Sequence, residues 1–264
     1  MSIFDRFRLD GKVALITGAG KGIGAGIARA YAEAGADVVL AARTEADLTA
    51  VAAEVEAFGR RALVVPTDVM EADQLQNVVD KTLEVFGGID ILVNNAGGFP
   101  PKPALDTPTS QFDYAMRFNV STAYTLTMLC ARHLAEREGS IVNISSIAGE
   151  KPTPCFSAYG TAKGALSLLT KELAQEFAPK IRVNAIAVGS TRTDALNTVL
   201  NDEIEAVMVS LTPMARLGEV EDIALGALYL ASPAASYVTG EILAVNGGLE
   251  RLNMEMPRAF GGVG

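Results

Sequence analysis

Residues 12–24 read Lys12-Val13-Ala14-Leu15-Ile16-Thr17-Gly18-Ala19-Gly20-Lys21-Gly22-Ile23-Gly24. The run 12–17 is short and apolar, which favours a strand because no room remains for a helix before the glycines. A helical stretch, 25–34, follows and ends at Gly35. A strand, a glycine loop and a helix in this order form a phosphate cradle, since the backbone can approach an anion placed at the positive N-terminus of the helix. An ordinary glycine-rich loop without a ligand is the alternative.

The rest of the chain repeats the alternation of apolar strands and helical stretches. Parallel strands need crossover helices, so the pattern predicts an α/β fold, a Rossmann-type doubly wound parallel sheet of about seven strands with helices on both faces. No linker interrupts the alternation, and we expect a single domain over residues 1–264. Strands are expected near 12–17, 37–41, 61–66, 89–93, 139–145, 181–187 and 241–245, and helices near 23–34, 45–58, 71–86, 111–136, 156–178 and 219–231.

A second informative pattern lies in the segment 156–177, which is rich in Ala and Leu, ends before Pro179 and is predicted to be a helix. Tyr159 and Lys163 are four residues apart and therefore share one face of that helix. A tyrosine ionises near pH ~10, so it serves as an acid or base at neutral pH only if a positive charge such as that of Lys163 lowers its pKa. Ser146, thirteen residues before the tyrosine, is placed to hold a substrate oxygen. A chance spacing on an Ala-rich helix is the alternative.

Composition argues against several classes of protein. The net charge is −9 and no basic cluster is present, which argues against a nucleic-acid partner. No apolar run reaches the ~18 residues of a membrane span, and the N-terminus lacks the core of a signal peptide, so we expect a cytoplasmic protein without membrane attachment. Cys130, Cys155 and the single histidine, His133, show no paired metal-ligand spacing. We expect free thiols, a surface histidine and no metal.

Four motifs, in order, resemble those of the short-chain dehydrogenase/reductase family. The loop Thr17–Gly24 is similar to its T-G-x-x-x-G-x-G motif, Asn94-Asn95-Ala96-Gly97 to its N-N-A-G motif, residues 143–146 to its serine strand, and Tyr159-x-x-x-Lys163 to its catalytic pair. The resemblance extends from Leu9 to Gly248. The stretches 91–103 and 193–236 are similar to bacterial hydroxysteroid dehydrogenases of the 7α type.

The resemblance implies an enzyme that interconverts a secondary alcohol and a ketone with a nicotinamide cofactor. Tyr159 would then be the general acid in reduction and the base in oxidation, and both Ser146 and Tyr159 would contact the substrate oxygen. Lys163 would lower the pKa of Tyr159 and bind the nicotinamide ribose. Asn119 matches the fourth catalytic residue, which holds a water linked to Lys163. Alternatively, this mid-helix asparagine kinks the helix or bonds its own backbone.

The same resemblance implies that residues from several loops bind the dinucleotide. Asp68 and Val69 would meet the adenine, Asn95 the adenosine ribose, and Thr193 the nicotinamide amide. The family's Pro-Gly after the sixth strand is Val188-Gly189 here, and because valine does not fix φ, we expect a looser loop. The predicted cofactor-binding set is Gly18, Lys21, Gly22, Ile23, Gly24, Arg43, Asp68, Val69, Asn95, Ala96, Gly97, Tyr159, Lys163, Thr191 and Thr193.

The end of the second strand predicts which dinucleotide is used. NAD sites place a carboxylate there for the ribose hydroxyls, but this strand ends in Ala42 followed by Arg43. The Arg43 guanidinium can bind a 2′-phosphate, and Lys21 lies in the glycine loop with no acid opposing either cation. We therefore predict that NADP(H) is preferred over NAD(H). A solvated Arg43 and an incidental Lys21 are the alternatives.

Two segments concern the substrate. Residues 190–215 break the strand–helix alternation and are predicted to close over the substrate, unless they are an ordinary long connection. Phe99, Pro100, Pro101 and Phe156 with this region would form a hydrophobic pocket for a small carbonyl or alcohol substrate, either a steroid or an acyl chain. A 3-oxoacyl-thioester reductase is the alternative activity, and a non-catalytic dinucleotide-sensing protein is the alternative from another class.

The expected assembly is a homotetramer. The resemblance suggests pairing through helices 111–136 and 156–178, where Leu166, Leu168 and Leu169 exceed one sheet-facing stripe. The tail 250–264 is either disordered or packed on a neighbouring subunit, and the sequence leaves both open.

Overall fold

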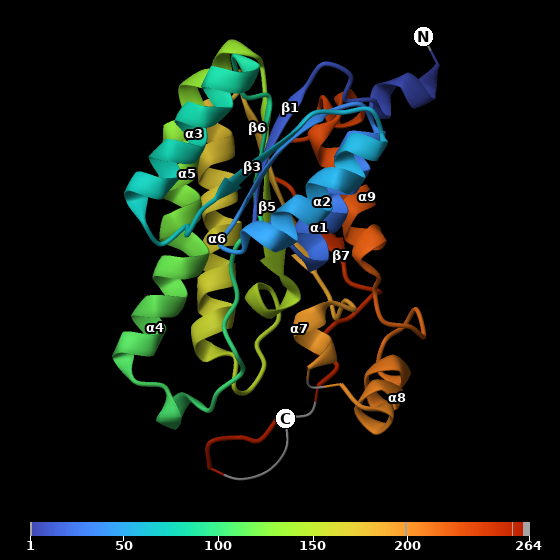
Figure 1. Cartoon of the computed structure of the whole chain (residues 1–264). Helices are drawn as coiled ribbons and strands as arrows, with labels where there is room; N and C mark the ends of the chain where they lie inside the picture. The colour runs from blue at the N-terminus through green and yellow to red at the C-terminus, as the bar shows by residue number, and fades with distance from the viewer. Residues whose placement is uncertain (1, 199, 255, 261–264) are drawn as a thin grey trace.

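The strands form one parallel sheet in the computed structural model, which describes residues 2–198, 200–254 and 256–260 (Figure 1). The order across the sheet is β3-β2-β1-β4-β5-β6-β7, as expected for a doubly wound Rossmann-type fold. The order reverses between β1 and β4, so a crevice opens beyond the carboxyl ends of these two strands. The strands are β1 (Val13–Thr17), β2 (Asp37–Ala42), β3 (Ala62–Pro66), β4 (Ile91–Asn94), β5 (Ser140–Ser146), β6 (Arg182–Val188) and β7 (Ile242–Val245).

Helices cover both faces of the sheet. In Figure 1, α1, α2 and α9 lie on one side and α3, α4, α5 and α6 on the other. The predicted helix 111–136 is observed as α4 and α5, joined by a π-helical segment, Arg117–Ser121. The predicted substrate region 190–215 contains two further helices, α7 and α8. The helices are α1 (Gly22–Glu33), α2 (Glu45–Ala57), α3 (Ala72–Phe86), α4 (Thr109–Met116), α5 (Thr122–Glu136), α6 (Ser157–Phe177), α7 (Asp194–Asn197), α8 (Asp202–Ser210) and α9 (Val220–Ala231).

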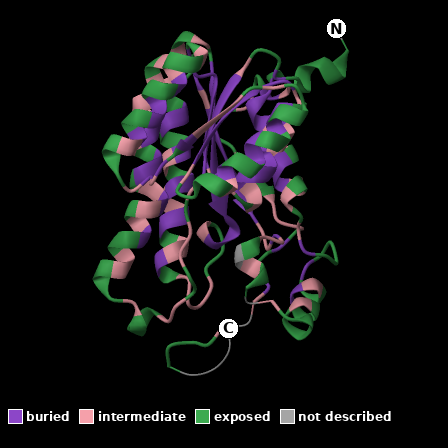
Figure 2. Ribbon diagram, in the orientation of Figure 1, coloured by how far each residue is buried: buried purple, intermediate pink, exposed green. Residues whose placement is uncertain are grey.

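The core consists of two apolar clusters, one on each face of the sheet. Successive strand residues point to opposite faces, so Ile16 packs with α1 and α9 residues whereas Leu15 packs with α3 and α5 residues. All five residues of β1 are buried, which explains why this strand reads as an unbroken apolar run. Figure 2 shows the buried strands between helices whose outer faces are exposed.

A buried polar network fixes α6 on the sheet. The Asn94 side-chain amide donates to Asn143 Oδ1 at 2.8 Å, and the Asn143 amide donates to Thr170 Oγ1 at 2.9 Å. Closer to the site, the hydroxyls of Ser145 and Ser167 lie 2.9 Å apart, and Ser145 donates to the Lys163 carbonyl at 3.1 Å. Buried groups of this kind need partners, so the network allows one placement of α6 along β5.

The structure also bears on the predictions made for the cysteines, the histidine and membrane attachment. Cys130 and Cys155 are both free, as expected, and His133 is half-buried rather than fully exposed. None of the described helices combines the length and the apolarity needed to cross a bilayer. Positions 1, 199, 255 and 261–264 lie outside the described residues, and the predictions for 1–264, 190–215 and 250–264 fall partly on them.

Candidate active site

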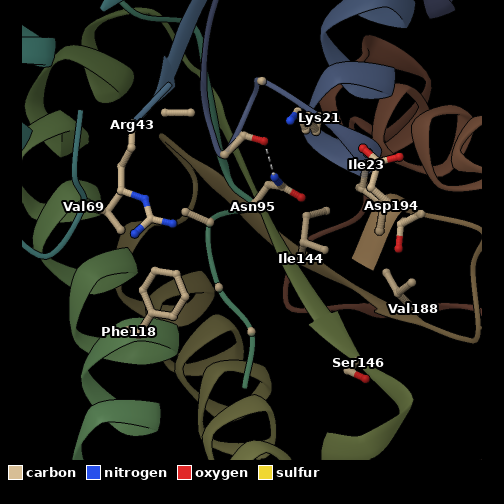
Figure 3. Close-up of a pocket in the computed structure, with 18 of the residues that line it drawn as sticks. Lys21, Ile23, Arg43, Val69, Asn95, Phe118, Ile144, Ser146, Val188 and Asp194 are labelled. Carbon is tan, nitrogen blue, oxygen red and sulfur yellow. Dashed lines mark hydrogen bonds between the residues drawn. The ribbon is translucent and has the colours of Figure 1, made fainter. Parts of the chain in front are cut away.

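A cavity of about 600 Å³ opens beyond the carboxyl ends of β1, β2, β4, β5 and β6. Figure 3 shows Arg43 toward one end of the group of lining residues and Ser146 toward the other. Among the predicted site residues, the cavity brings together Gly18, Lys21, Gly22, Ile23, Arg43, Asp68, Val69, Asn95, Ala96, Gly97, Ser146, Tyr159, Lys163 and Thr193.

The glycine loop is held by the loop that follows β4. The Asn95 side-chain amide donates to the carbonyls of Thr17 and Gly18 at 2.9 and 3.1 Å. The Thr17 hydroxyl accepts from the backbone N–H groups of Asn95 and Ala96 at 3.0 and 3.1 Å. Gly24 does not line the cavity but lies beneath the loop, where a Cβ would come within 2.3 Å of the Gly18 carbonyl oxygen. Glycine at position 24 therefore allows the close approach of helix and loop.

The N-terminus of α1 faces the same cavity. The helix begins at Gly22, whose φ of +53° is in the left-handed region that glycine tolerates. The N-cap residue, Lys21, forms no side-chain capping bond in the described structure. The first N–H groups of α1 are therefore available to an anion, and the helix dipole favours negative charge there.

The Ser, Tyr and Lys side chains come from β5 and α6. Ser146 ends β5, and its hydroxyl accepts from the backbone N–H of Ala148 at 3.2 Å. Lys163 is 4% exposed, and its ammonium donates to the carbonyl of Ile144 at 2.8 Å. The Lys163 nitrogen lies 5.7 Å from the centre of the Tyr159 ring. The three side chains thus meet at the end of the cavity away from Arg43.

Burial changes the acidity of two of these groups. Removal from water raises the pKa of Tyr159 because the phenolate is disfavoured, and the Ser146 hydroxyl opposes this with a smaller effect. Burial lowers the pKa of Lys163 to about 8. The sequence-based expectation of a lowered Tyr159 pKa is therefore wrong for the chain as described, because it considered the nearest charge and not the burial of both groups.

Asn119 lies behind the cavity, in the π-helical segment. Its Oδ1 accepts from the Gly98 N–H at 2.8 Å, and its amide donates to the carbonyls of Gly98 and Ala115 at 3.1 and 2.9 Å. It thus bonds its own helix, as one alternative expected, and also holds the loop after β4. A Cβ on Gly97 would come within 2.7 Å of Asn119 Oδ1 and 3.1 Å of the Lys163 nitrogen. The water link to Lys163 stays a prediction.

The loop after β6 is tied down despite Val188. Strand β6 continues through Val188, which pairs with Ser146 and Val245. Beyond it, Gly189 N–H donates to the Val245 carbonyl at 3.1 Å and Arg192 N–H to the Gly218 carbonyl at 2.8 Å. Strand pairing therefore holds the backbone on both sides of Val188, and the looser loop expected from valine stays a prediction.

The two predicted threonines of this loop are separated by the structure. Thr193 lines the cavity, and its hydroxyl caps α7 by accepting from the Leu196 N–H at 3.3 Å. Thr191 is buried and lines a second cavity of about 270 Å³ between the ends of β6 and β7. A contact between Thr191 and the dinucleotide stays a prediction.

Asp47 is a cavity residue that the sequence analysis did not identify. It lies in the first turn of α2, and its carboxylate is 3.1 Å from the Lys21 ammonium. Lys21 therefore has an opposing acid, contrary to our expectation. Arg43 is exposed, points into the cavity in Figure 3, and forms no ion pair within the described part of the chain. The sequence signal for Asp47 is an acidic residue in the first turn of the helix that follows β2, beyond the strand end on which our prediction rested.

The structure separates the residues that were predicted to form a hydrophobic substrate pocket. Phe156 lines a third cavity of about 550 Å³ beside α6, together with Cys155 and Pro257, and its ring centre is 6.3 Å from that of Tyr159. Phe99 is half-buried, and Pro100 and Pro101 are exposed. The structure therefore groups Phe156 with part of the C-terminal tail beside α6, and within the described residues neither 99–101 nor 190–215 lines that cavity.

A Rossmann-type sheet whose crevice joins a glycine loop to a Ser, Tyr and Lys group defines a nucleotide-binding oxidoreductase. Comparison with known proteins agrees. The model of a family described as enoyl-(acyl carrier protein) reductase matches residues 18–250. An uncharacterised oxidoreductase of Mycobacterium tuberculosis is 47% identical over 258 residues, which are 97% of this chain and 98% of the relative. The 7α-hydroxysteroid dehydrogenase of Escherichia coli K12 is 42% identical over 252 residues, 94% of this chain and 98% of the relative.

Solved structures show the same relationship. A 7α-hydroxysteroid dehydrogenase complexed with NADH and 7-oxo glycochenodeoxycholic acid matches with a TM-score of 0.90 and 42% identity, over 94% of this chain and 98% of that one. A gluconate 5-dehydrogenase from Burkholderia cenocepacia in complex with NADP and tartrate matches with a TM-score of 0.88 and 36% identity, over 94% and 98%. The chain belongs to the short-chain dehydrogenase/reductase family, whose members use NAD or NADP and act on alcohol groups.

Proposed function

We propose that this protein interconverts a hydrophobic secondary alcohol and a ketone, with NADP(H) as the hydride carrier and Tyr159 as the general acid and base. The observation that carries the proposal is the single cavity that holds Ser146, Tyr159 and Lys163 at one end and the glycine loop at the other. The residues fit a dinucleotide, because α1 presents free N–H groups and Gly24 keeps the loop close to the helix.

The residues of the catalytic end divide the work on the substrate. The bound nicotinamide supplies or accepts the hydride. Ser146 and Tyr159 donate hydrogen bonds to the substrate oxygen, and Tyr159 transfers its proton as negative charge develops there. The raised pKa of Tyr159 keeps the phenol protonated at neutral pH, so the proton is present for ketone reduction, but its release needs a nearby positive charge. Lys163, held by the Ile144 carbonyl, places a positive charge near the ring that favours the phenolate once it forms.

The variant Tyr159→Phe tests this assignment, because it removes only the hydroxyl. We expect turnover to fall about 10²–10⁴-fold, the usual contribution of general acid catalysis, with NADPH affinity and thermal stability nearly unchanged. Tyr237→Phe, at a fully exposed position outside α5 and α6, is the matched control. Near-normal turnover by Tyr159→Phe on a substrate that the wild type reduces would exclude this mechanism.

The preference for NADP(H) rests on Arg43. Its guanidinium lines the end of the cavity after β2, where Ala42 supplies no carboxylate to repel a 2′-phosphate. Titration of the wild type with both reduced cofactors tests the preference, and tighter binding of NADH would refute it. The double variant Ala42→Asp, Arg43→Ile should shift the preference toward NADH by a few kcal/mol at most, since each charge contact is worth ~1.5–3 kcal/mol.

The substrate is proposed to be a steroid-like or other bulky apolar carbonyl compound. The support is the apolar space beside α6, lined by Phe156 and Pro257. A panel of hydroxysteroids, ketones and 3-oxoacyl thioesters, followed at the absorbance of NADPH, distinguishes this proposal from a thioester reductase. Turnover confined to the thioesters would refute the steroid-like assignment.

We also propose that the chain acts in the cytoplasm as one catalytic domain assembled into a tetramer. Leu168 on α6 and Tyr124 on α5 are 58% and 46% exposed, which supports pairing through these helices. Leu166, by contrast, is buried within the subunit and is not a spare apolar residue, contrary to the sequence-based expectation. Light scattering at micromolar concentration measures the assembly, and a monomeric mass would contradict it.

A further inference from the structure

Asn253 lies in the tail that follows β7, and its side chain forms hydrogen bonds through both its amide nitrogen and its amide oxygen. It is 1% exposed. Its amide donates to the Met208 carbonyl at 3.0 Å and to the Thr212 hydroxyl at 2.8 Å, and its Oδ1 accepts from the Ser190 hydroxyl at 2.5 Å. Each hydrogen-bonding group of the side chain therefore has a partner, and the three partners come from two other segments.

These partners connect the proposed substrate region to the loop after β6. Met208 lies in the last turn of α8, and Thr212 follows that helix. Ser190 follows Gly189, which lines the 600 Å³ cavity, and precedes Thr193, which lines the cavity and caps α7. Asn253 thus bonds both the far end of the α7–α8 region and the loop from which that region starts.

A second interaction between the same segments, a pair of salt bridges, is more exposed to solvent. Arg192 pairs with Glu205 on α8 and with Glu219, the latter at 3.2 Å. The Arg192 and Glu205 side chains are 37% and 31% exposed, so water screens this pair. The two hydrogen bonds donated by the Asn253 amide are buried, and the one from Ser190 is half-buried, so water screens them less than it screens the ion pair. Without Asn253, the Met208 carbonyl keeps only the Thr212 hydroxyl, at 2.7 Å, as a side-chain partner within the described residues. We therefore expect Asn253 to be the dominant tie.

The tail then continues toward the catalytic helix. The Pro257 carbonyl accepts from Cys155 Sγ at 3.5 Å, just before α6, and Pro257 lines the 550 Å³ cavity with Phe156. Figure 1 shows this segment in red, at the same end of the molecule as α7 and α8. The described part of the tail therefore contacts both the 190–215 region and the segment before α6, and Asn253 is its buried anchor.

We propose that Asn253 is a positioning residue that holds α7 and α8 against the loop carrying Thr193, and so sets the shape of the substrate side of the cavity. The proposal rests on the function proposed above. It predicts an effect that depends on substrate size, because a small ketone needs only Ser146 and Tyr159, whereas a bulky one would also reach the cavity wall at Thr193 and Asp194, which α7 and α8 hold in place.

The test uses Asn253→Ala, with Arg251→Ala as the control at an exposed tail position. Asn253→Ala should raise KM for a bulky carbonyl substrate at least tenfold, while KM for a small ketone and Kd for NADPH stay within about twofold. Amide hydrogen exchange of α8 should become faster in Asn253→Ala and not in Arg251→Ala. Ser190→Ala keeps the anchor in the tail but breaks its link to the loop, so it should give a smaller change of the same kind if Asn253→Ala does not fold.

Several results would overturn the proposal. One is unchanged α8 exchange in Asn253→Ala, and another is an equal rise in both KM values and in Kd, which would indicate general destabilisation. Additive effects of Asn253→Ala and Ser190→Ala on KM would show that the two residues do not act together. Hydrogen exchange needs no substrate, so absence of turnover by the wild type would count against the proposed function and leave the positioning role separately measurable.

Discussion

The approach of α1 to the glycine loop can be tested by adding one methyl group, in Gly24→Ala. The new Cβ would come within 2.3 Å of the Gly18 carbonyl oxygen and 2.5 Å of the Asn95 side-chain nitrogen. An ordinary contact requires Gly18 to move away by about 1 Å. Neither neighbour moves freely. The Gly18 oxygen belongs to the backbone of a residue with a φ of +64°, and the Asn95 side-chain nitrogen is hydrogen-bonded to the carbonyls of Thr17 and Gly18.

The magnitude follows from three effects. Overpacking costs about 1–3 kcal/mol, and weakening the two Asn95 hydrogen bonds costs about 1 kcal/mol each. Alanine regains about 1 kcal/mol because it favours the helix more than glycine does. The free energy of unfolding should therefore fall by about 3 kcal/mol, which lowers Tm by roughly 6–12 °C for a chain of this size. A loop displaced by about 1 Å should bind NADPH about 30-fold or more weakly, equivalent to about 2 kcal/mol.

The matched control is Gly20→Ala in the same loop. A Cβ at Gly20 would lie 3.1 Å from Asp47 Cβ, so its neighbour needs to move by only a few tenths of an ångström, against about 1 Å at Gly24. We expect Gly20→Ala to change Tm and NADPH affinity much less than Gly24→Ala. The chain contains no tryptophan, so the fluorescence of NADPH reports binding without tryptophan emission from the protein. Wild-type affinity and stability in Gly24→Ala, or equal damage in both variants, would refute the packing argument.

Three further predictions concern charge and buried polarity. The Lys163 pKa is about 8, below its usual value, so above that pH the folded chain binds fewer protons than the unfolded chain and Lys163 loses its charge. The Kd for NADPH should therefore rise about tenfold between pH 8 and 9.5, and Lys163→Ala should abolish this pH dependence. Asp47→Asn frees Lys21 from its ion pair and should tighten NADPH binding about three- to tenfold with little change for NADH, and an unchanged ratio in titrations would contradict this. Ser167→Ala removes the hydroxyl bonded to Ser145 and should cost about 1 kcal/mol of unfolding free energy in urea, with no cost at all as the contrary result.

Much of the fold and part of the site follow from local sequence patterns. The glycine loop, the strand–helix alternation and the four-residue spacing of Tyr159 and Lys163 depend on neighbours within one or two turns of chain, and the sequence shows these directly. The sequence also predicted that Ser146 would meet this pair, because its strand and α6 are consecutive elements. The order of the sheet then brought those groups to the crevice with the glycine loop.

Only the tertiary structure decided the features that depend on burial and on approach between distant segments. It placed Asp47 on Lys21, 26 positions earlier, and Asn253 among Ser190, Met208 and Thr212. It also reversed the expected direction of the Tyr159 pKa shift, because the loss of water around a side chain depends on all the segments that enclose it. A sequence motif records which groups are present and how far apart they lie along the chain. Desolvation and pairing with remote groups are set only when the helices, the sheet and the tail pack together.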